Sequence, residues 1–507
     1  MTDLVAPLPS TARVKNLGLL QVIILFFLAV KIVYVFRVGP IMDEAYYWMW
    51  GQHPGLSYFD HPPLQAWLLG ISDFLFGRSL LALRWMTLAT LGGIFYFYHL
   101  WAKRLAGENW QTLFWPGIVI YLASPTLGYF TSLAFHDYLL LFLCLSSGHF
   151  FLNFLLATDA GEKPKHRDLY IAAFLLGLAG LTKYNAVFLG LGVFFYILAK
   201  PSLRRLLLDP HLYLAAVLAM GMQAPVIIWN LSNGFSSFEF HLSTRHGSGW
   251  LTDINWRSFW DFPGASAFLM SPFLIPVFVR FFLRRHDNRF EEVAKGLAIW
   301  VFWLSTGTFI LVSLFDWVFW WWNLVAYILV MPFAAKHMGQ RFLFYGHVIF
   351  GALVTIYMIV STAVLPLSLF HGDNPDWRQT RLYGWEELRD GLQAARDQYQ
   401  PDFIASFGPD LASVAGFALD EPEVTALTDR VTQFYYWFDR QAHVGQDALI
   451  VLFKNEGTDG FVRKQFETLT PIGEIEVTRF GHWLNGFELY YAQNYQPTSP
   501  GRDFSPQ

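Results

Sequence analysis

Hydrophobic positions run along most of this sequence in long blocks that short polar stretches separate. A helix needs roughly 20 apolar residues to cross a bilayer, and eleven segments within residues 1–365 approach that length. They are 17–36, 79–100, 111–131, 138–157, 169–182, 184–199, 212–231, 265–283, 294–315, 318–335 and 342–365. The pattern predicts a mainly α-helical polytopic membrane protein.

Lysine and arginine gather in alternate connections between these segments, for example at 103–104, 163–167 and 200–205. Short connections rich in basic residues stay in the cytoplasm, so these connections are expected on that side. Because basic residues flank 169–199 at both ends, the chain has to cross twice there. We expect it to turn back near residues 182–185.

The composition changes after residue 365. Residues 385–398 have a helical pattern, whereas 448–453 and 487–491 have the pattern of strands. An odd number of spans places this tail outside the cytoplasm. The sequence therefore predicts two domains: a multi-span transmembrane domain over 1–365, and a small extracytoplasmic α/β domain over 366–507.

The overall composition agrees with a membrane protein and excludes other classes. Hydrophobic residues make up 54% of the chain, aromatic residues 19% and charged residues 15%, and the mean hydropathy is +0.34. The net charge of −4 gives no reason to propose a nucleic-acid partner. Cys144 is the single cysteine, so an intramolecular disulfide is excluded and we expect a packing role. The polar N-terminus precedes no cleavage signal, and 17–36 is expected to stay as the first span.

The richest polar connection is the first outer loop, residues 37–78. Asp43 and Glu44 follow the first span, and the aromatic-rich amphipathic stretch after them suits helices lying in the membrane interface. Asp60 and His61 come next and precede two prolines. A purely structural alternative stays open, in which the first two carboxylates cap a helix and Asp60-His61 belong to a rigid proline turn.

Other ionisable residues are expected at the same membrane depth. Asp137 follows His136 in a very short turn, Lys183 lies at the predicted hairpin, and Arg245 and His246 lie in the outer loop 232–264, which also contains His241. Capping of a helix by Asp137 and snorkelling of Lys183 to the interface are the structural alternatives. Lys31, inside the first span, is expected to snorkel and is left out of the predicted site.

Two aspartates beside lysine, arginine and histidine suit a reaction between a lipid phosphate and a hydroxyl group. The basic groups would stabilise the charge that grows on the leaving phosphate, and one carboxylate would accept the hydroxyl proton, as in a single displacement with inversion. The sequence contains no phosphate-binding Walker loop, dinucleotide fingerprint or Cys/His zinc cluster. It predicts no certain cofactor, although the carboxylates could coordinate a divalent metal, whose ligands stay unknown.

Several motifs resemble a known family. They are 43–48 (DEAYYW), 58–64 (YFDHPPL), 136–137 (HD), 180–184 (GLTKY), 322–323 (WN), 382–385 (LYGW) and 430–437 (RVTQFYYW). Together they resemble the C-type glycosyltransferases of the protein O-mannosyltransferase and aminoarabinose transferase (ArnT-like) group, including its bacterial members. The resemblance extends over most of the chain.

The resemblance implies roles for particular residues. It implies Asp43 as the catalytic base, Asp137 as a second catalytic or orienting carboxylate, and His61, Lys183 and Arg245 as phosphate-binding residues. The predicted donor- and substrate-binding set also includes Glu44, Tyr46, Asp60, His246 and Asn323.

The resemblance also implies a partner for each side of the reaction. The donor would be a polyprenyl-phosphate sugar, and the acceptor a hydroxyl of lipid A, lipopolysaccharide or another envelope glycolipid at the outer face of the bacterial inner membrane. A protein O-mannosyltransferase-like enzyme is the alternative within the class. A polyprenyl-linked sugar flippase is the alternative outside it, although a transporter places polar residues at the bilayer midplane on broken helices. The tryptophans at 317–322 suit an interface belt, with sugar stacking as the functional alternative.

Overall fold

Helices make up most of this computed structural model, which describes residues 17–242, 253–285, 288–370, 376–454, 456 and 460–498. The chain divides into two compact units. The first comprises Met1–Val33, Met86–Ala224 and Leu251–Ile356, and the second Tyr34–Trp85, Pro225–Trp250 and Tyr357–Gln507. The second unit therefore joins three segments that are far apart in the sequence.

Five of the described helices are long and apolar enough to cross a membrane. They are α2 (Leu17–Arg37), α5 (Leu80–Ala106), α7 (His136–Asp159), α15 (Arg289–Ser313) and α17 (Arg341–Ala363). Each coincides with one of the segments predicted from hydropathy. The prediction of a mainly α-helical polytopic membrane protein is confirmed.

Four further predicted segments lie within pairs of helices that are sharply bent between their two members, and counting each pair as one span raises the possible number of spans among the described residues to nine. The pairs are α6 (Gln111–Ala123) with Pro125–Ser132 (84°), Tyr184–Ala199 with Pro201–Leu208 (111°), α10 (Pro210–Gly221) with α11 (Ala224–Ser232) (45°), and α13 (Trp256–Met270) with Pro272–Leu283 (84°). In three of the pairs a proline begins the second helix. Proline has no N–H to continue the helical hydrogen bonds, and this explains why the bends occur there.

The two remaining predicted segments do not form long helices. Segment 169–182 lies within α8 (His166–Thr182), which has only 17 residues. Segment 318–335 consists mainly of short 3₁₀ turns, namely η8 (Trp320–Tyr327) and η9 (Met331–Phe333), followed by α16 (Ala334–His337). Because a 3₁₀ helix rises about 2.0 Å per residue against about 1.5 Å in an α-helix, such a segment extends further than its length suggests. The total of eleven spans stays a prediction.

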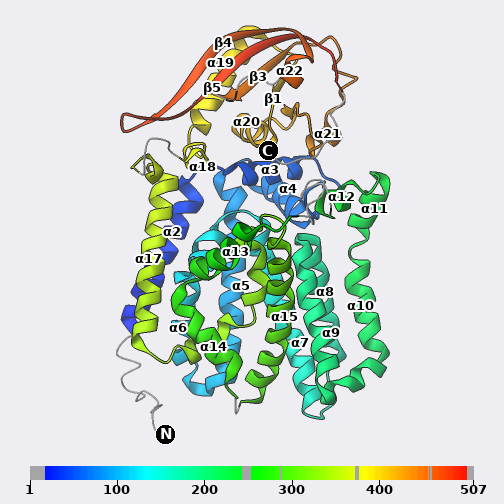
Figure 1. Ribbon diagram of the computed structural model, residues 1–507, viewed down its shortest axis with the longest axis vertical. Coiled ribbons are helices and arrows are strands. Elements are labelled where there is room, and N and C mark those ends of the chain that lie inside the picture. Colours follow the sequence, from blue (N-terminus) through cyan, green and yellow to red (C-terminus); the bar gives the residue numbers. More distant parts are fainter. Residues whose placement is uncertain are drawn as a thin grey trace. The chain divides into compact units, whose positions relative to one another are not determined.

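Helices of the first unit pack closely. In Figure 1, α7, α8 and α9 (Val187–Ala199) run side by side, and α9 packs against α15. Glycine permits this approach from both helices: a Cβ atom at Gly192 would lie 2.4 Å from Val301, and one at Gly296 would lie 2.3 Å from the Tyr196 ring. Small residues at contacts of this kind are typical of membrane helices.

The second unit contains a five-stranded mixed sheet in the order β2-β1-β3-β5-β4. Its strands are β1 (Phe403–Ser406), β2 (Thr425–Ala426), β3 (Ala448–Phe453), β4 (Phe466–Arg479) and β5 (His482–Tyr495). β1 pairs in parallel with β2 and β3, whereas β5 pairs antiparallel with β3 and β4. The β4–β5 hairpin turns at Phe480 and Gly481, whose φ angles of 52° and 80° suit a two-residue type I′ turn. β3 and β5 confirm the predicted strands.

Helices connect this sheet to the first loop, residues 37–78. α19 (Trp385–Tyr399) packs against β4 and against α20 (Pro409–Leu419), and α20 packs against β1 and β3. α20 also contacts α3 (Met42–Gln52), which packs on α4 (Leu64–Phe76) (Figure 1). The tail thus shares a compact unit with the first loop.

Shorter elements complete the described part of the chain. The helices are α12 (Ser236–Leu242), α14 (Ile275–Leu283), α18 (Trp377–Thr380), α21 (Phe434–Trp437) and α22 (Gly460–Arg463). Short 3₁₀ turns include η1 (Gly107–Asn109), η4 (Tyr184–Ala186), η5 (Pro201–Leu208) and η10 (Leu367–Phe370). Of these, α12 and α21 carry residues of the candidate site.

Candidate active site

Helix α3 presents two adjacent carboxylates to different surroundings. Asp43 is exposed, whereas Glu44 is fully buried and forms an ion pair with Arg84, in which Nε lies 2.8 Å from Oε1. The Glu44 carboxylate also accepts a hydrogen bond from the backbone N–H of Ile41, so it caps the helix that carries it. Both carboxylates lie in the first turn, where the helix dipole favours negative charge.

Arg84 ties three elements of the second unit together. Its guanidinium donates to the carbonyl oxygens of Tyr34, Val38 and Gly39 at 3.1, 2.6 and 2.9 Å, in addition to the Glu44 carboxylate. These carbonyls belong to the last turn of α2 and to the connection that leads to α3. One side chain of α5 thus provides hydrogen-bond donors to both segments. Sequence reasoning missed Arg84, although an arginine within a predicted span is itself a signal of a structural or functional role.

Tyr46 connects the start of the first loop to its proline turn. The Tyr46 hydroxyl donates to Asp60 Oδ2 at 2.7 Å and accepts from the backbone N–H of Gln433 at 3.2 Å. Burial, together with the charge of Asp60, raises the pKa of Tyr46 well above its usual value of 10.0, so the hydroxyl keeps its proton and remains a donor. The Asp60 carboxylate is thereby held against α3.

His61 is half-buried among aromatic rings. Its ring centroid lies 6.0 Å from that of Tyr47, 6.1 Å from that of Trp50 and 6.1 Å from that of His241. His241 of α12 donates through Nε2 to the backbone carbonyl of Asp60 at 2.7 Å. The structure therefore adds a second imidazole beside His61. His241 was visible in the sequence of the predicted outer loop, but nothing in that sequence indicated its hydrogen-bond partner.

The motif at 430–437 packs onto this loop. Phe434 stacks on Tyr46 with ring centroids 5.8 Å apart, and Trp437 stacks on His53 at 4.4 Å. The Gln433 side-chain oxygen accepts from the backbone N–H of Phe59 at 2.7 Å. A segment near the end of the chain thus holds the turn that carries Asp60 and His61.

Asp137 and Lys183 form a buried ion pair in the first unit. Lys183 Nζ lies 2.8 and 3.0 Å from the two Asp137 carboxylate oxygens, and the side chains are 8% and 3% exposed. Asp137 lies in the first turn of α7, and Lys183 follows the last residue of α8. The turn that the sequence predicted near residues 182–185 coincides with a break between two helices, because α8 ends at Thr182 and α9 begins at Val187. Neither residue is simply an exposed cap or a snorkelling side chain.

Asn323 is buried and bound to α15. Its Oδ1 accepts from Ser305 Oγ at 2.7 Å, and its Nδ2 donates to Thr306 Oγ1 at 2.9 Å. The neighbouring backbone carbonyl of Trp322 accepts from Asn185 Nδ2 at 2.6 Å. These contacts position η8, and a direct substrate contact for Asn323 stays a prediction.

Lys31 does not snorkel as the sequence led us to expect. Its side chain is buried, and Nζ donates to the carbonyl of Gly128 at 3.2 Å and to the hydroxyls of Thr131 and Ser132 at 3.3 and 3.0 Å. The expectation of snorkelling was wrong because the irregular turn after α6 supplies three acceptors that hydropathy does not reveal.

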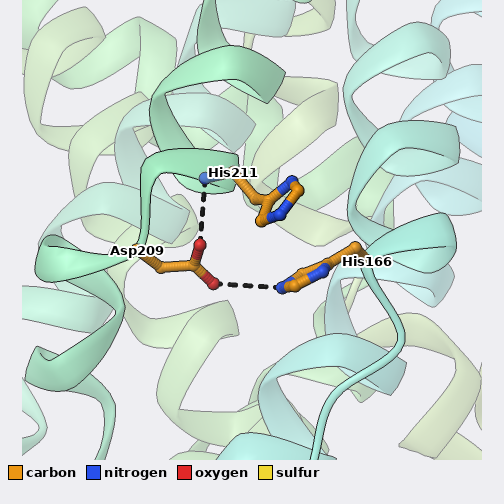
Figure 2. A group of neighbouring side chains, drawn as sticks. All are labelled: His166, Asp209 and His211. Atoms are coloured by element: carbon orange, nitrogen blue, oxygen red, sulfur yellow. Dashed lines mark hydrogen bonds and ion pairs between the residues drawn. The ribbon is translucent and has the colours of Figure 1, made fainter.

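Arg245 and His246 lie outside the described residues. Among the described residues, the side chains grouped closely enough to hold a metal ion are His166, Asp209 and His211 (Figure 2), none of which belongs to the predicted site.

Comparison with known proteins shows that the fold is similar to that of ArnT and supports the predicted resemblance. Residues 60–229 match the family described as dolichyl-phosphate-mannose-protein mannosyltransferase. That segment begins at Asp60 and includes Asp137 and Lys183.

Particular relatives are similar over different shares of the chain. The lipid A galacturonosyltransferase RgtD of Rhizobium johnstonii is 26% identical over 279 residues, which is 54% of this chain and 54% of that protein. The chain thus matches about half the length of this curated relative. Crystal structures of ArnT from Cupriavidus metallidurans superpose with a TM-score of 0.60 at 13% identity. The apo structure covers 97% of this chain and 99% of its own, and the undecaprenyl-phosphate complex covers 94% and 98%.

Proposed function

We propose that this protein is an inverting glycosyltransferase of the membrane that moves a sugar from a polyprenyl phosphate to a hydroxyl of lipid A or a related envelope glycolipid. The observation that carries the proposal is the exposed carboxylate of Asp43 on a helix that the buried Glu44–Arg84 pair holds in place. Because the helix that carries Asp43 is already held in place, no conformational entropy has to be lost to position this carboxylate when it accepts a proton.

The proposed reaction is a single displacement at the anomeric carbon of the sugar. The acceptor oxygen forms a bond to that carbon as the bond to the phosphate oxygen breaks, and the configuration inverts. Asp43 takes the hydroxyl proton, and the polyprenyl phosphate leaves with the electron pair. His61, Lys183 and Arg245 are the proposed phosphate-binding residues, because cationic donors stabilise the charge that grows on the leaving group.

The other predicted residues have supporting roles in the proposal. Asp137 orients Lys183 through their ion pair, and Tyr46 orients Asp60 through its hydrogen bond. Glu44 acts as a positioning residue, since Arg84 and Ile41 engage its carboxylate. His246 and Asn323 are proposed to contact the substrate.

The choice of substrates follows the relatives. RgtD acts, by its name, on lipid A, and ArnT has been crystallised with undecaprenyl phosphate. We infer the same donor class and acceptor class here, with the reaction at the outer face of the bacterial inner membrane and the tail on that side. The name of the matching family favours a second candidate, transfer to a protein hydroxyl.

Mass spectrometry of envelope lipids and glycoproteins tests the function. Cells would carry the wild-type chain, no chain, Asp43→Asn, or Asp390→Asn at matched expression; Asp390 is an exposed carboxylate of α19 and serves as control. We expect one lipid to lose a single sugar in the null and Asp43→Asn cells, with accumulation of its polyprenyl-phosphate donor, and no change with Asp390→Asn.

Other outcomes would change the conclusion. Loss of the sugar from a glycoprotein instead of a lipid would establish the protein acceptor. A null phenotype that Asp43→Asn fully restores would overturn the assignment of Asp43 as the base.

A further inference from the structure

The starts of helices α8 and α10 bring together three side chains that bind metals in many proteins. His166 is the first residue of α8, Asp209 is the N-cap of α10, and His211 lies one residue after Pro210, which begins α10. The two helices pack against each other within the first unit. Figure 2 shows the Asp209 carboxylate beside both imidazole rings.

The distances already approach those of a coordination site. His166 Nε2 lies 3.2 Å from Asp209 Oδ2. Two ligands of a tetrahedral zinc ion with bonds of about 2.0–2.1 Å lie about 3.3 Å apart. One ligand atom from each of the three residues lies within 4.8 Å of the others.

Tyr170 forms a hydrogen bond with one of the two imidazole rings, that of His211. His211 Nδ1 lies 2.8 Å from the Tyr170 hydroxyl oxygen. In the tautomer whose Nδ1–H donates to that oxygen, Nε2 is the nitrogen available to bind a metal. An outer partner on the second ring nitrogen is the usual support of a metal-binding histidine. The other Asp209 oxygen accepts from the backbone N–H of His211 at 2.9 Å, so the carboxylate is oriented as well.

We propose that His166, Asp209 and His211 bind a divalent transition-metal cation, with Zn²⁺ as the expected ion. Two imidazoles and one carboxylate are a donor set that zinc accepts, and a water molecule would complete its tetrahedron. The ring centroids of His166 and His211 lie 3.8 Å apart. A bound cation takes histidine ligands in their neutral form.

The site is separate from the proposed chemistry. α8 has 17 residues and therefore spans about 25 Å between His166 and its last turn, after which Lys183 follows. The cation would fasten the start of α8 to the start of α10. By the positive-inside argument, basic residues 163–167 place this end of α8 on the cytoplasmic side, so the ion would come from the cytoplasm.

Zinc binding to the purified full-length protein tests the proposal. The untagged protein in detergent is stripped with chelator, then titrated with Zn²⁺ alone, and bound zinc and the thermal unfolding midpoint are measured. Asp209→Asn is the informative variant, because asparagine caps helices as well as aspartate but is a poor metal ligand. We expect it to bind one zinc fewer than wild type and to lose the zinc-dependent rise in the midpoint.

Two further variants make the result decisive. Tyr170→Phe removes only the supporting hydroxyl, and we expect zinc affinity about 10–100-fold weaker. His482→Gln replaces an exposed histidine of β5 and should bind as wild type does. Equal zinc content and equal midpoint shifts in wild type, Asp209→Asn and Tyr170→Phe would overturn the proposal. Because the readout is binding and not transfer, it does not depend on the proposed enzymatic function.

Discussion

Adjacent residues in this chain have opposite surroundings, and the candidate site depends on that difference. Asp43 and Glu44 are separated by one helical step, yet the first is exposed and the second is fully buried against Arg84. The sequence predicted both as functional carboxylates, with Asp43 as the base and Glu44 in the substrate-binding set, but it did not reveal their different burial. The partner that separates their roles lies 40 residues away on α5.

Replacing Glu44 should destabilise the fold more than replacing a carboxylate of an exposed ion pair does. Glu44→Gln leaves the Arg84 charge without its carboxylate, and loss of one partner of a buried pair costs about 3–5 kcal/mol of unfolding free energy. Glu421→Gln, in the half-exposed Arg396–Glu421 pair, is the matched control and should cost no more than about 1 kcal/mol. Thermal and chemical unfolding in detergent measure both. Equal effects would show that the Glu44–Arg84 pair contributes little stability.

Tyr46 should affect activity through Asp60. Tyr46→Phe removes the hydrogen bond to the Asp60 carboxylate, and a bond to a charged group contributes about 1.5–3 kcal/mol. We expect kcat/KM to fall by about 10–100-fold while the protein stays folded, as judged by size-exclusion chromatography. A variant with wild-type kinetics would remove Asp60 from the proposed site.

Tyr58 should make the protein sensitive to alkaline pH. Burial raises the pKa of Tyr58 from 10.0 to about 12. The folded state therefore keeps a proton that the unfolded state loses, and the stabilising contribution present below pH 10 disappears between pH 10 and about 12. In that window the wild type should lose about 1.4 kcal/mol per pH unit more than Tyr58→Phe. Below pH 9 the two proteins should differ by a constant amount, and parallel curves throughout would contradict the assignment.

At the scale of elements, α3 and α4 approach each other where each has a glycine. A Cβ atom at Gly70 would lie 2.5 Å from the backbone oxygen of Gly51, and one at Gly51 would lie 2.7 Å from the backbone nitrogen of Gly70. The loop between these helices carries Asp60 and His61, so the spacing of α3 and α4 determines where those side chains lie.

A methyl group at this contact should separate the helices. Gly70→Ala is expected to cost about 1–3 kcal/mol of unfolding free energy, because the blocking atoms are backbone and cannot rotate away. Gly92→Ala, at a position of α5 with open space around it, is the control and should stabilise by about 0.5–1 kcal/mol. If both variants unfold alike, the close contact is not important to stability.

Hydropathy located the helices better than it described their form. The five long helices coincide with predicted segments because their apolar runs are continuous. The bends at Pro125, Pro201 and Pro272 and the 3₁₀ turns of η8 depend on local backbone geometry, which a count of apolar residues does not contain. For the candidate site, too, the sequence located the residues better than it predicted their contacts. The motifs identified the residues of the first loop, whereas the contacts of Arg84, His241 and Gln433 depend on how distant segments pack.

At the scale of the whole molecule, the grouping of segments differs from the order of the sequence. The hydrogen bond between Phe59 and Gln433 connects residues 374 positions apart. Amino-acid composition separates the tail after residue 365 from the rest of the chain. Composition reflects whether a segment is surrounded by lipid or by water, and it does not show which segments pack together. The structure instead groups Tyr357–Gln507 with Tyr34–Trp85 in one unit. Gln433 of the tail holds the turn that carries Asp60 and His61. Replacing Gln433 should therefore lower the transferase activity.

The sidedness of the chain follows from its charge pattern and can be measured with cysteine labelling. Cys144 is buried, so a Cys144→Ala chain provides a background without accessible thiols. Asp390→Cys and Arg167→Cys each place one thiol at an exposed position, on α19 and on α8 respectively. If basic residues 163–167 are cytoplasmic and an odd number of spans precedes the tail, a membrane-impermeant maleimide should label Asp390→Cys in intact spheroplasts. It should label Arg167→Cys only after permeabilisation.

Each departure from that result has a distinct meaning. Labelling of both thiols in intact cells would contradict the cytoplasmic assignment of residues 163–167 and remove the reason for two crossings within 169–199. Protection of both would place the tail in the cytoplasm and require an even number of spans. Since a donor sugar at the outer face has to meet residues on the same side as the tail, protection of Asp390→Cys would also contradict the proposed outer-face reaction.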